Sequence, residues 1–217
     1  MVSTTNVKLL GAFFSPFVNR VQMAFNLKSV EFEYVEESLS SKSKLLLDSN
    51  PVYGKVPVMI HDDKIICESL VIVQYIDQYG YRNRPIFAYV DDKLIPLLKE
   101  LLWAKEEEYI TLKERVEEVM TVLEKAFVKC SAGKAYFGGD DVGFIDIALG
   151  SCLEFIRAME EISAMKLVDE ARTPELVRWA ERLRLNDAVK DFLPETEMVV
   201  DVLKRIQSKT FFTPVSV

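Results

Sequence analysis

The stretch LLGAFFSPFVNRV, residues 9–21, joins an apolar run to a helical pattern. The apolar run ends at Ser15, Pro16 follows, and apolar residues then recur at near-helical spacing. Serine is a preferred N-cap residue, and proline suits the first position of a helix. A helix N-terminus also favours a nearby anion, because its N–H groups and its dipole carry partial positive charge. The stretch therefore predicts a strand, a turn and a helix, with Ser15 as either a simple cap or an active-site hydroxyl.

The first eighty residues alternate between short strand patterns and short helix patterns. Strands are expected over residues 7–13 and 31–38, and as a pair within 55–69 around the turn Asp62-Asp63. Helices are expected over residues 16–29, 41–51 and 68–80. The order β-α-β-α-β-β-α predicts a small α/β domain over residues 1–80.

Beyond Pro85 the strand patterns nearly vanish, and long helical patterns take their place. These patterns cover residues 90–130, 143–162, 173–185 and 194–207. The final stretch, residues 208–217, is not expected to be helical, and Pro96 should kink or break the helix that contains it. The sequence therefore predicts an all-helical domain over residues 86–217, so the fold class is α/β followed by all-α.

Composition limits the classes of function. The 217 residues carry a formal net charge of -7, which argues against nucleic acid and anionic membranes as partners. The three cysteines are far apart and there is one histidine, so no metal site can be assembled by spacing. Unpatterned cysteines and the lack of a recognisable secretion signal predict a cytosolic setting.

Three stretches of the first domain offer complementary polar groups. Glu68 and Ser69 open a predicted helix, where the serine can hold a carboxylate and the glutamate an ammonium. Val56 precedes a proline that enters a strand, so its backbone can pair with an extended peptide. Lys42 and Lys55 can meet a second carboxylate. Together these groups suit a short peptide that is charged at both ends.

Each of these residues also has a purely structural interpretation. Serine and the Glu68-Ser69 pair are common at helix starts, and the two lysines suit a solvated surface. Asp146 is expected to be a helix-start carboxylate, and Cys67 a buried and unreactive thiol.

Four motifs together resemble one family. SPFVNRV (15–21), NPVYGKVPVMIHDDK (50–64) and CESLVIVQYID (67–77) are similar to the glutathione-binding domain of plant tau-class glutathione transferases. YFGGDDVGFIDIAL (136–149) resembles a motif in the second domain of that class. The resemblance implies the glutathione transferase fold, which is a thioredoxin-like domain followed by an all-helical domain. It also implies a cytosolic homodimer that uses glutathione as cosubstrate, and the family is associated with detoxification and stress.

The resemblance implies a role for each matching residue. Ser15 would be catalytic, because its hydroxyl would donate a hydrogen bond to the glutathione sulfur and stabilise the thiolate. Lys42 and Lys55 would bind the glycyl carboxylate, Val56 the cysteinyl backbone, and Glu68 and Ser69 the γ-glutamyl group. By position, the residues expected to line the electrophile pocket are Phe17, Ile95, Lys99, Leu102, Trp103 and Phe155.

The expected reaction is conjugation of the glutathione thiolate to small apolar electrophiles, or reduction of hydroperoxides by the same thiolate. The alternative is a weakly catalytic or non-catalytic protein that binds apolar ligands. This alternative is kept because the join QYGYRNRPIFAYV, residues 78–90, is shorter than in the family by about four or five helical turns. Gly54 also stands where the family often has a basic residue. Thiol–disulfide exchange is disfavoured, since position 15 is serine and the chain has no C-x-x-C motif.

Overall fold

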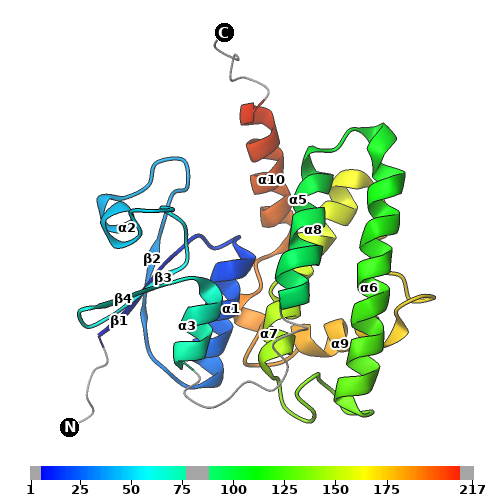
Figure 1. The fold of residues 1–217 in the computed structure, drawn as a ribbon, viewed down its shortest axis with the longest axis horizontal. Coiled ribbons are helices and arrows are strands. Elements are labelled where there is room, and N and C mark those ends of the chain that lie inside the picture. The colour runs from blue at the N-terminus through cyan, green and yellow to red at the C-terminus, as the bar shows by residue number, and fades with distance from the viewer. Residues whose placement is uncertain (1–5, 77–87, 211–217) are drawn as a thin grey trace. The chain divides into compact units, whose positions relative to one another are not determined.

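The structure of the 217-residue chain is a computed structural model that describes residues 6–76 and 88–210. The chain divides into two compact units (Figure 1). The first comprises residues 1–80 and 187–192, and the second comprises residues 81–186 and 193–217. Residues 187–192 thus cluster with the α/β part, although their sequence lies within the helical part.

A four-stranded mixed sheet forms the centre of the first unit. Its strand order is β2-β1-β3-β4, with β1 parallel to β2 and antiparallel to β3, and β3 antiparallel to β4. The strands are β1 (Val7–Gly11), β2 (Glu33–Glu36), β3 (Val58–His61) and β4 (Lys64–Cys67). The helices of this unit are α1 (Pro16–Leu27), α2 (Lys44–Ser49) and α3 (Ser69–Ile76), with the 3-10 turn η3 (Lys190–Phe192).

Helices cover both faces of this sheet. Leu9 and Leu10 point to opposite faces because side chains alternate along a strand, yet both are fully buried. Leu10 packs with Leu46 of α2. Gly11 shares the face of Leu9, and a Cβ atom at Gly11 would lie only 2.5 Å from Cγ1 of Val18 in α1. Helix α1, which packs against α3, therefore covers the face opposite α2.

The predicted order of elements in the first unit is confirmed. The first strand is shorter than expected, because the Ser15 N–H donates to the carbonyl of Ala12 at 2.9 Å and this turn ends the extended run. The third helix is described as far as Ile76, and the rest of its predicted range lies outside the described residues.

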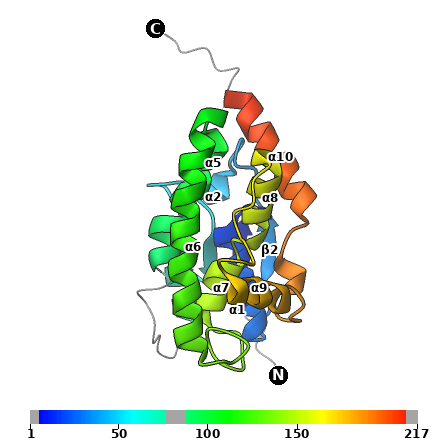
Figure 2. The same cartoon turned by 90° about the vertical axis from the view of Figure 1, so that its right-hand side faces the viewer.

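The described part of the second unit is helical, as predicted (Figure 2). Helix α5 packs against α6 and α8, α9 packs against α6, and α10 packs against α8. Among the described helices, none combines the length and the apolar character needed to cross a membrane. The elements are η1 (Val90–Leu94), α5 (Ile95–Trp103), η2 (Glu106–Glu108), α6 (Tyr109–Ser131), α7 (Phe144–Gly150), α8 (Leu153–Ser163), α9 (Pro174–Arg184) and α10 (Thr196–Thr210).

The disturbance expected at Pro96 takes the form of a π-helical turn and not of a break, because the Ile95 N–H donates to the carbonyl of Val90 and α5 continues through the proline. This wider turn accommodates a residue that has no N–H of its own. The last helix also continues through Thr210, beyond the predicted end at residue 207.

Asp146 anchors the loop that precedes α7. The residue is fully buried. Its carboxylate accepts hydrogen bonds from the backbone N–H groups of Phe137 (2.8 Å), Gly138 (3.1 Å) and Gly143 (2.8 Å), and from Nε1 of Trp179 (2.7 Å). Burial raises the pKa of Asp146, and the four donors act against that rise. The predicted structural role of Asp146 is therefore confirmed.

We expect Asp146→Asn to lower the free energy of unfolding by about 3 kcal/mol or more, because the amide presents N–H groups to buried N–H donors. Chemical denaturation monitored by tryptophan fluorescence measures the change. Asp141→Asn is the matched control, since Asp141 is an exposed carboxylate of the same loop. Equal stability of the two variants would contradict the anchoring role.

Candidate active site

Ser15 stands at the N-cap position of α1, in the turn that follows β1. Its backbone has φ -80° and ψ 118°, which is extended, and Pro16 is the first helical residue. The Ser15 carbonyl accepts from the N–H groups of Val18 (2.9 Å) and Asn19 (3.0 Å), so the main chain starts the helix. The serine thus lies beside the positive end of the helix dipole.

The hydroxyl of Ser15 does not cap this helix. In the described part of the chain, no hydrogen bond runs from an N–H group of the first turn of α1 to the Ser15 side chain. By contrast, the hydroxyl of Ser43 accepts from the Leu46 N–H at 3.0 Å and caps α2. The simple cap interpretation of Ser15 therefore fails for the side chain, and the hydroxyl can serve another partner.

A buried arginine connects the starts of α1 and α3. Arg20 is fully buried, and its Nη1 donates to Oγ of Ser69 at 3.4 Å. The centre of its guanidinium lies 5.1 Å from the centroid of the Phe17 ring. A positive charge therefore lies beneath Ser69, the predicted site of the γ-glutamyl contact. The sequence analysis did not predict a role for Arg20. The signal that could have indicated it is a charged residue within an apolar helical pattern.

Glu68 holds a backbone conformation that is unusual for its residue type. Its φ is +71°, in the left-handed region, which costs a residue with a Cβ roughly 1–2 kcal/mol. The Glu68 carbonyl accepts from the Ile72 N–H at 2.9 Å, so the strained residue opens α3 and leaves its side chain exposed. Such strain often marks binding sites, and it agrees with the predicted role of Glu68.

The backbone of Val56 is presented by a loop that Asn50 holds. The Asn50 side chain donates to the carbonyl of Lys55 at 3.1 Å, and the Asn50 carbonyl accepts from the Gly54 N–H at 2.7 Å. The Val56–Pro57 bond is cis. Within residues 6–76 and 88–210, no hydrogen bond is made to the backbone of half-buried Val56. This arrangement suits the predicted pairing with an extended peptide.

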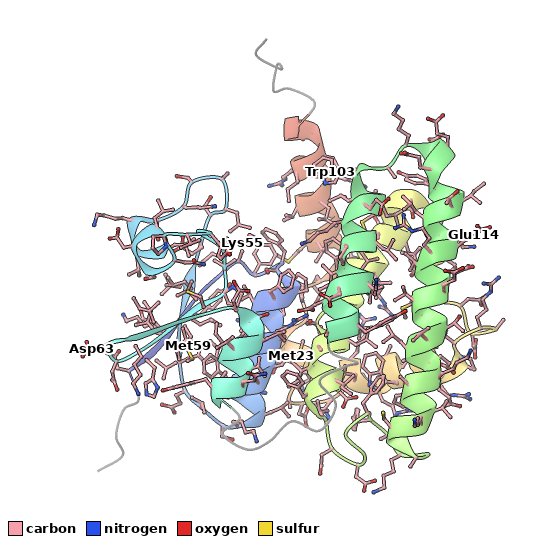
Figure 3. The ribbon with its side chains drawn as sticks, viewed as in Figure 1. Met23, Lys55, Met59, Asp63, Trp103 and Glu114 are labelled. Carbon is pink, nitrogen blue, oxygen red and sulfur yellow. The ribbon has the colours of Figure 1, made fainter. Side chains whose placement is uncertain are left out.

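Lys42 and Lys55 both border Gly54, and both are exposed. A Cβ atom at Gly54, where φ is +54°, would lie 3.5 Å from Nζ of Lys42. Nζ of Lys55 lies 5.5 Å from the ring centroid of Tyr53. Lys55 belongs to the loop between α2 and β3 (Figure 3). The structure therefore brings the two predicted lysines to one loop, and Lys42 occupies the space beside the glycine.

The residues predicted for the electrophile pocket fall in both units. Phe17 is half-buried in the first unit. In the second unit, Lys99 and Trp103 lie one helical turn apart on the exposed side of α5, and Phe155 is half-buried on α8. Ile95 and Leu102 are only 4% and 5% exposed and belong to the core. Their grouping into one pocket stays a prediction.

Other features of the described residues do not add to this site. Two cavities of the second unit, of about 540 Å³ and 190 Å³, are lined by none of the predicted site residues. No cluster of three or more histidine, cysteine, aspartate or glutamate side chains suited to a metal ion occurs in the described ranges.

The family follows from comparison with known proteins. Residues 5–78 match the family described as glutathione S-transferase, N-terminal domain, and residues 90–196 match glutathione S-transferase, C-terminal domain. The chain belongs to the glutathione S-transferase family. Each domain match falls within the corresponding predicted domain.

Relatives and solved structures place this glutathione S-transferase in the tau class. It is 42% identical to glutathione S-transferase U17 of Arabidopsis thaliana, over 96% of this chain and 99% of that protein. A tau-class enzyme from mango, Mangifera indica, is 44% identical, with a TM-score of 0.87 over 93% of this chain and 98% of that one. A rice glutathione S-transferase, solved in complex with glutathione, is 31% identical, with a TM-score of 0.84 over 94% of this chain and 98% of that one. The predicted class and fold are confirmed.

The alignment with U17 also bears on the length of this glutathione S-transferase. It spans 224 positions, more than the 217 residues of this chain can fill, so the chain lacks residues that this relative has. The segment predicted to be shortened lies mostly within residues 77–87, outside the described residues.

Cys67 is the thiol next to the predicted γ-glutamyl contacts. Burial raises the pKa of the Cys67 thiol, and the negative charge of Glu68 raises it further. Its Sγ contacts the carbonyl of Ser49 at 3.7 Å. The thiolate is the reactive form, so the raised pKa agrees with the prediction of an unreactive thiol, although the residue is only half-buried.

Because the pKa of Cys67 is raised, its thiolate fraction at any pH below that pKa is smaller than that of an ordinary thiol. We expect its alkylation by iodoacetamide, followed by peptide mass spectrometry, to be slow at neutral pH and to rise at a higher pH than in the denatured chain. Glu68→Gln should shift the profile to lower pH, and the denatured chain provides the ordinary profile. Labelling of the folded protein at the denatured rate at pH 7 would refute this assignment.

Proposed function

We propose that this glutathione transferase conjugates the thiolate of glutathione to small apolar electrophiles, and that the Ser15 hydroxyl donates a hydrogen bond to the thiolate. The observation that carries the proposal is that the Ser15 hydroxyl lies at the start of α1 and is not used as a cap. The family supports glutathione as the cosubstrate. The same thiolate would also serve the reduction of hydroperoxides.

One hydrogen bond and one helix N-terminus are sufficient for this role. A free thiol has a pKa of about 8.5, and each unit of lowering requires roughly 1.4 kcal/mol of preference for the thiolate. A hydrogen bond to a charged group contributes about 1.5–3 kcal/mol, and a helix N-terminus about 0.3–1 kcal/mol. Ser15 can therefore lower the thiol pKa by one to two units without a histidine or a carboxylate as base.

The peptide would be held along its length by the residues described above. Lys42 and Lys55 would meet the glycyl carboxylate, and the Val56 backbone would pair with the cysteinyl unit. Ser69, with the charge of Arg20 beneath it, would bind the γ-glutamyl carboxylate, and the exposed Glu68 would meet the ammonium. Phe17, Lys99, Trp103 and Phe155 would contact the electrophile, with Ile95 and Leu102 behind them.

We also propose a cytosolic homodimer. The three cysteines are free, as expected in a reducing compartment. Val52 and Tyr53 expose 79% and 62% of their surface, and Ile65 and Val71 about half, which supports a contact between protein surfaces.

A second candidate function is the binding of apolar ligands with weak catalysis or none. The observation that favours it is that the chain lacks residues that U17 has. In that case glutathione would bind and conjugation would stay near the uncatalysed rate, while anilinonaphthalene dyes would bind tightly.

The test is the initial rate of glutathione conjugation to chlorodinitrobenzene across pH. We expect Ser15→Ala to lower kcat/KM by tenfold or more and to raise the apparent thiol pKa by about one unit, since it removes one charge-assisted hydrogen bond. The glutathione KM should change little, because the peptide contacts remain. Ser41→Ala, an exposed serine of the loop before α2, is the matched control.

Two outcomes would refute the proposal. A Ser15→Ala enzyme with the wild-type rate and pH profile would return Ser15 to a structural role. A wild-type rate at the uncatalysed level, combined with tight dye binding, would favour the ligand-binding function.

A further inference from the structure

The side-chain amide of Asn19 lies against the turn that presents Ser15. Asn19 is 2% exposed and sits one helical turn after Ser15 in α1. With its nitrogen facing the turn, the amide donates to the carbonyl of Phe13 at 2.9 Å and to the carbonyl of Ser15 at 3.2 Å. The opposite orientation would set an amide oxygen against two carbonyl oxygens, so the donor orientation is the one that satisfies both groups.

Both N–H groups of this amide donate hydrogen bonds to the turn. The amide group has two N–H bonds, and two carbonyls of the turn accept them. On its other side the turn meets β2, because the Phe13 N–H donates to Oε1 of Glu36 at 3.4 Å. Two side chains therefore hold residues 13–15 in place: buried Asn19 of α1 and exposed Glu36 of β2.

Asn19 is a poor choice for helix stability alone. Asparagine is less favourable than alanine inside a helix, and a buried amide must be fully hydrogen-bonded to avoid a desolvation cost. Its neighbours Val18, Val21 and Met23 are apolar and buried. Within residues 6–76 and 88–210, what the amide gains at this position is the pair of hydrogen bonds to the Ser15 turn.

We propose that Asn19 is a positioning residue for Ser15, a proposal that rests on the function proposed above. By tying the carbonyls of Phe13 and Ser15 to α1, the amide sets the direction of the Ser15 Cα–Cβ bond and hence the place of the hydroxyl. Asn19 need not touch glutathione. A misplacement of a reacting group by about 1 Å can cost a hundredfold in rate.

The experiment titrates the thiol of glutathione bound to Asn19→Ala, through the ultraviolet absorbance of the thiolate. We expect the pKa of bound glutathione to rise by about one unit, which is about tenfold less thiolate at a pH below both values. The value of kcat/KM for chlorodinitrobenzene should fall by about tenfold to a hundredfold. The glutathione KM should stay near the wild-type value, because Lys42, Lys55, Val56, Glu68 and Ser69 are unchanged.

Asn26→Ala is the matched control. Asn26 lies on the same helix, and its side-chain amide also donates to a backbone carbonyl, that of Ala188 at 3.1 Å. We expect this variant to lose stability and to keep the wild-type thiol pKa. A general weakening of α1 would change both variants alike, and only a positioning role separates them.

Ser15→Ala, measured alongside, distinguishes the two ways in which the proposal can fail. If Ser15→Ala keeps the wild-type pKa, the proposed function and the role of Asn19 both fall. If Ser15→Ala raises the pKa and Asn19→Ala does not, only the role of Asn19 falls. Should Asn19→Ala not fold, hydrogen exchange of the wild-type side-chain amides decides the matter. The Asn19 amide protons should exchange much more slowly than those of Asn26, and equal rates would overturn the proposal.

Discussion

The close approach of α1 to the sheet at Gly11 sets the position of the whole site. A Cβ atom at Gly11 would lie 2.5 Å from Val18 and 2.9 Å from the ring of Tyr34, so only a glycine lets the helix come this near. The chain then has four residues, 12–15, in which to leave the strand and start the helix. Ser15 therefore stands at the end of β1 and at the start of α1 at once. Because α1 also packs against α3, the same contact places Arg20 beneath Ser69.

The polar residues inside the first unit serve its loops more than its core. Asn19 ties the Ser15 turn to α1, Asn50 ties the Val56 loop together, and Glu37 accepts from Oγ of Ser43 at 2.6 Å just after Lys42. Each of the three is less than 9% exposed. Burying such groups costs free energy unless their hydrogen bonds are made. Their common effect is to hold in place the loops that carry the predicted binding residues.

Much of the fold and of the candidate site could be predicted because the signals are local. Short runs of alternating and helical periodicity marked the strands and α-helices described within residues 6–76, and Ser15-Pro16 marked the start of α1. The roles of Asn19 and Asn50 could not be predicted, because their partners are backbone carbonyls whose positions depend on the turn. The π-helical turn before Pro96 could not be predicted either, because a proline within a helical pattern indicates a disturbance of the helix but not its form. The residues predicted for the electrophile pocket lie far apart in the sequence, so no local pattern connects them, and their grouping stays a prediction.

The proposed site contains several positive groups, whereas the protein as a whole has a negative net charge. Glutathione carries two carboxylates and one ammonium, and its thiolate adds a further negative charge, whereas the chain has a net charge of -7. At physiological ionic strength charges are screened over about 8 Å, so the groups near the peptide decide its binding. In the proposed site, Lys42, Lys55, buried Arg20 and the N-terminus of α1 would lie near the peptide, together with the exposed carboxylates of Glu36 and Glu68. In the proposed binding mode, the local cations would compensate the two carboxylates and the thiolate, and distant surface charges would contribute little. Because Arg20 is fully buried, its charge is screened less than those of the lysines, and its contribution should persist at salt concentrations that weaken theirs.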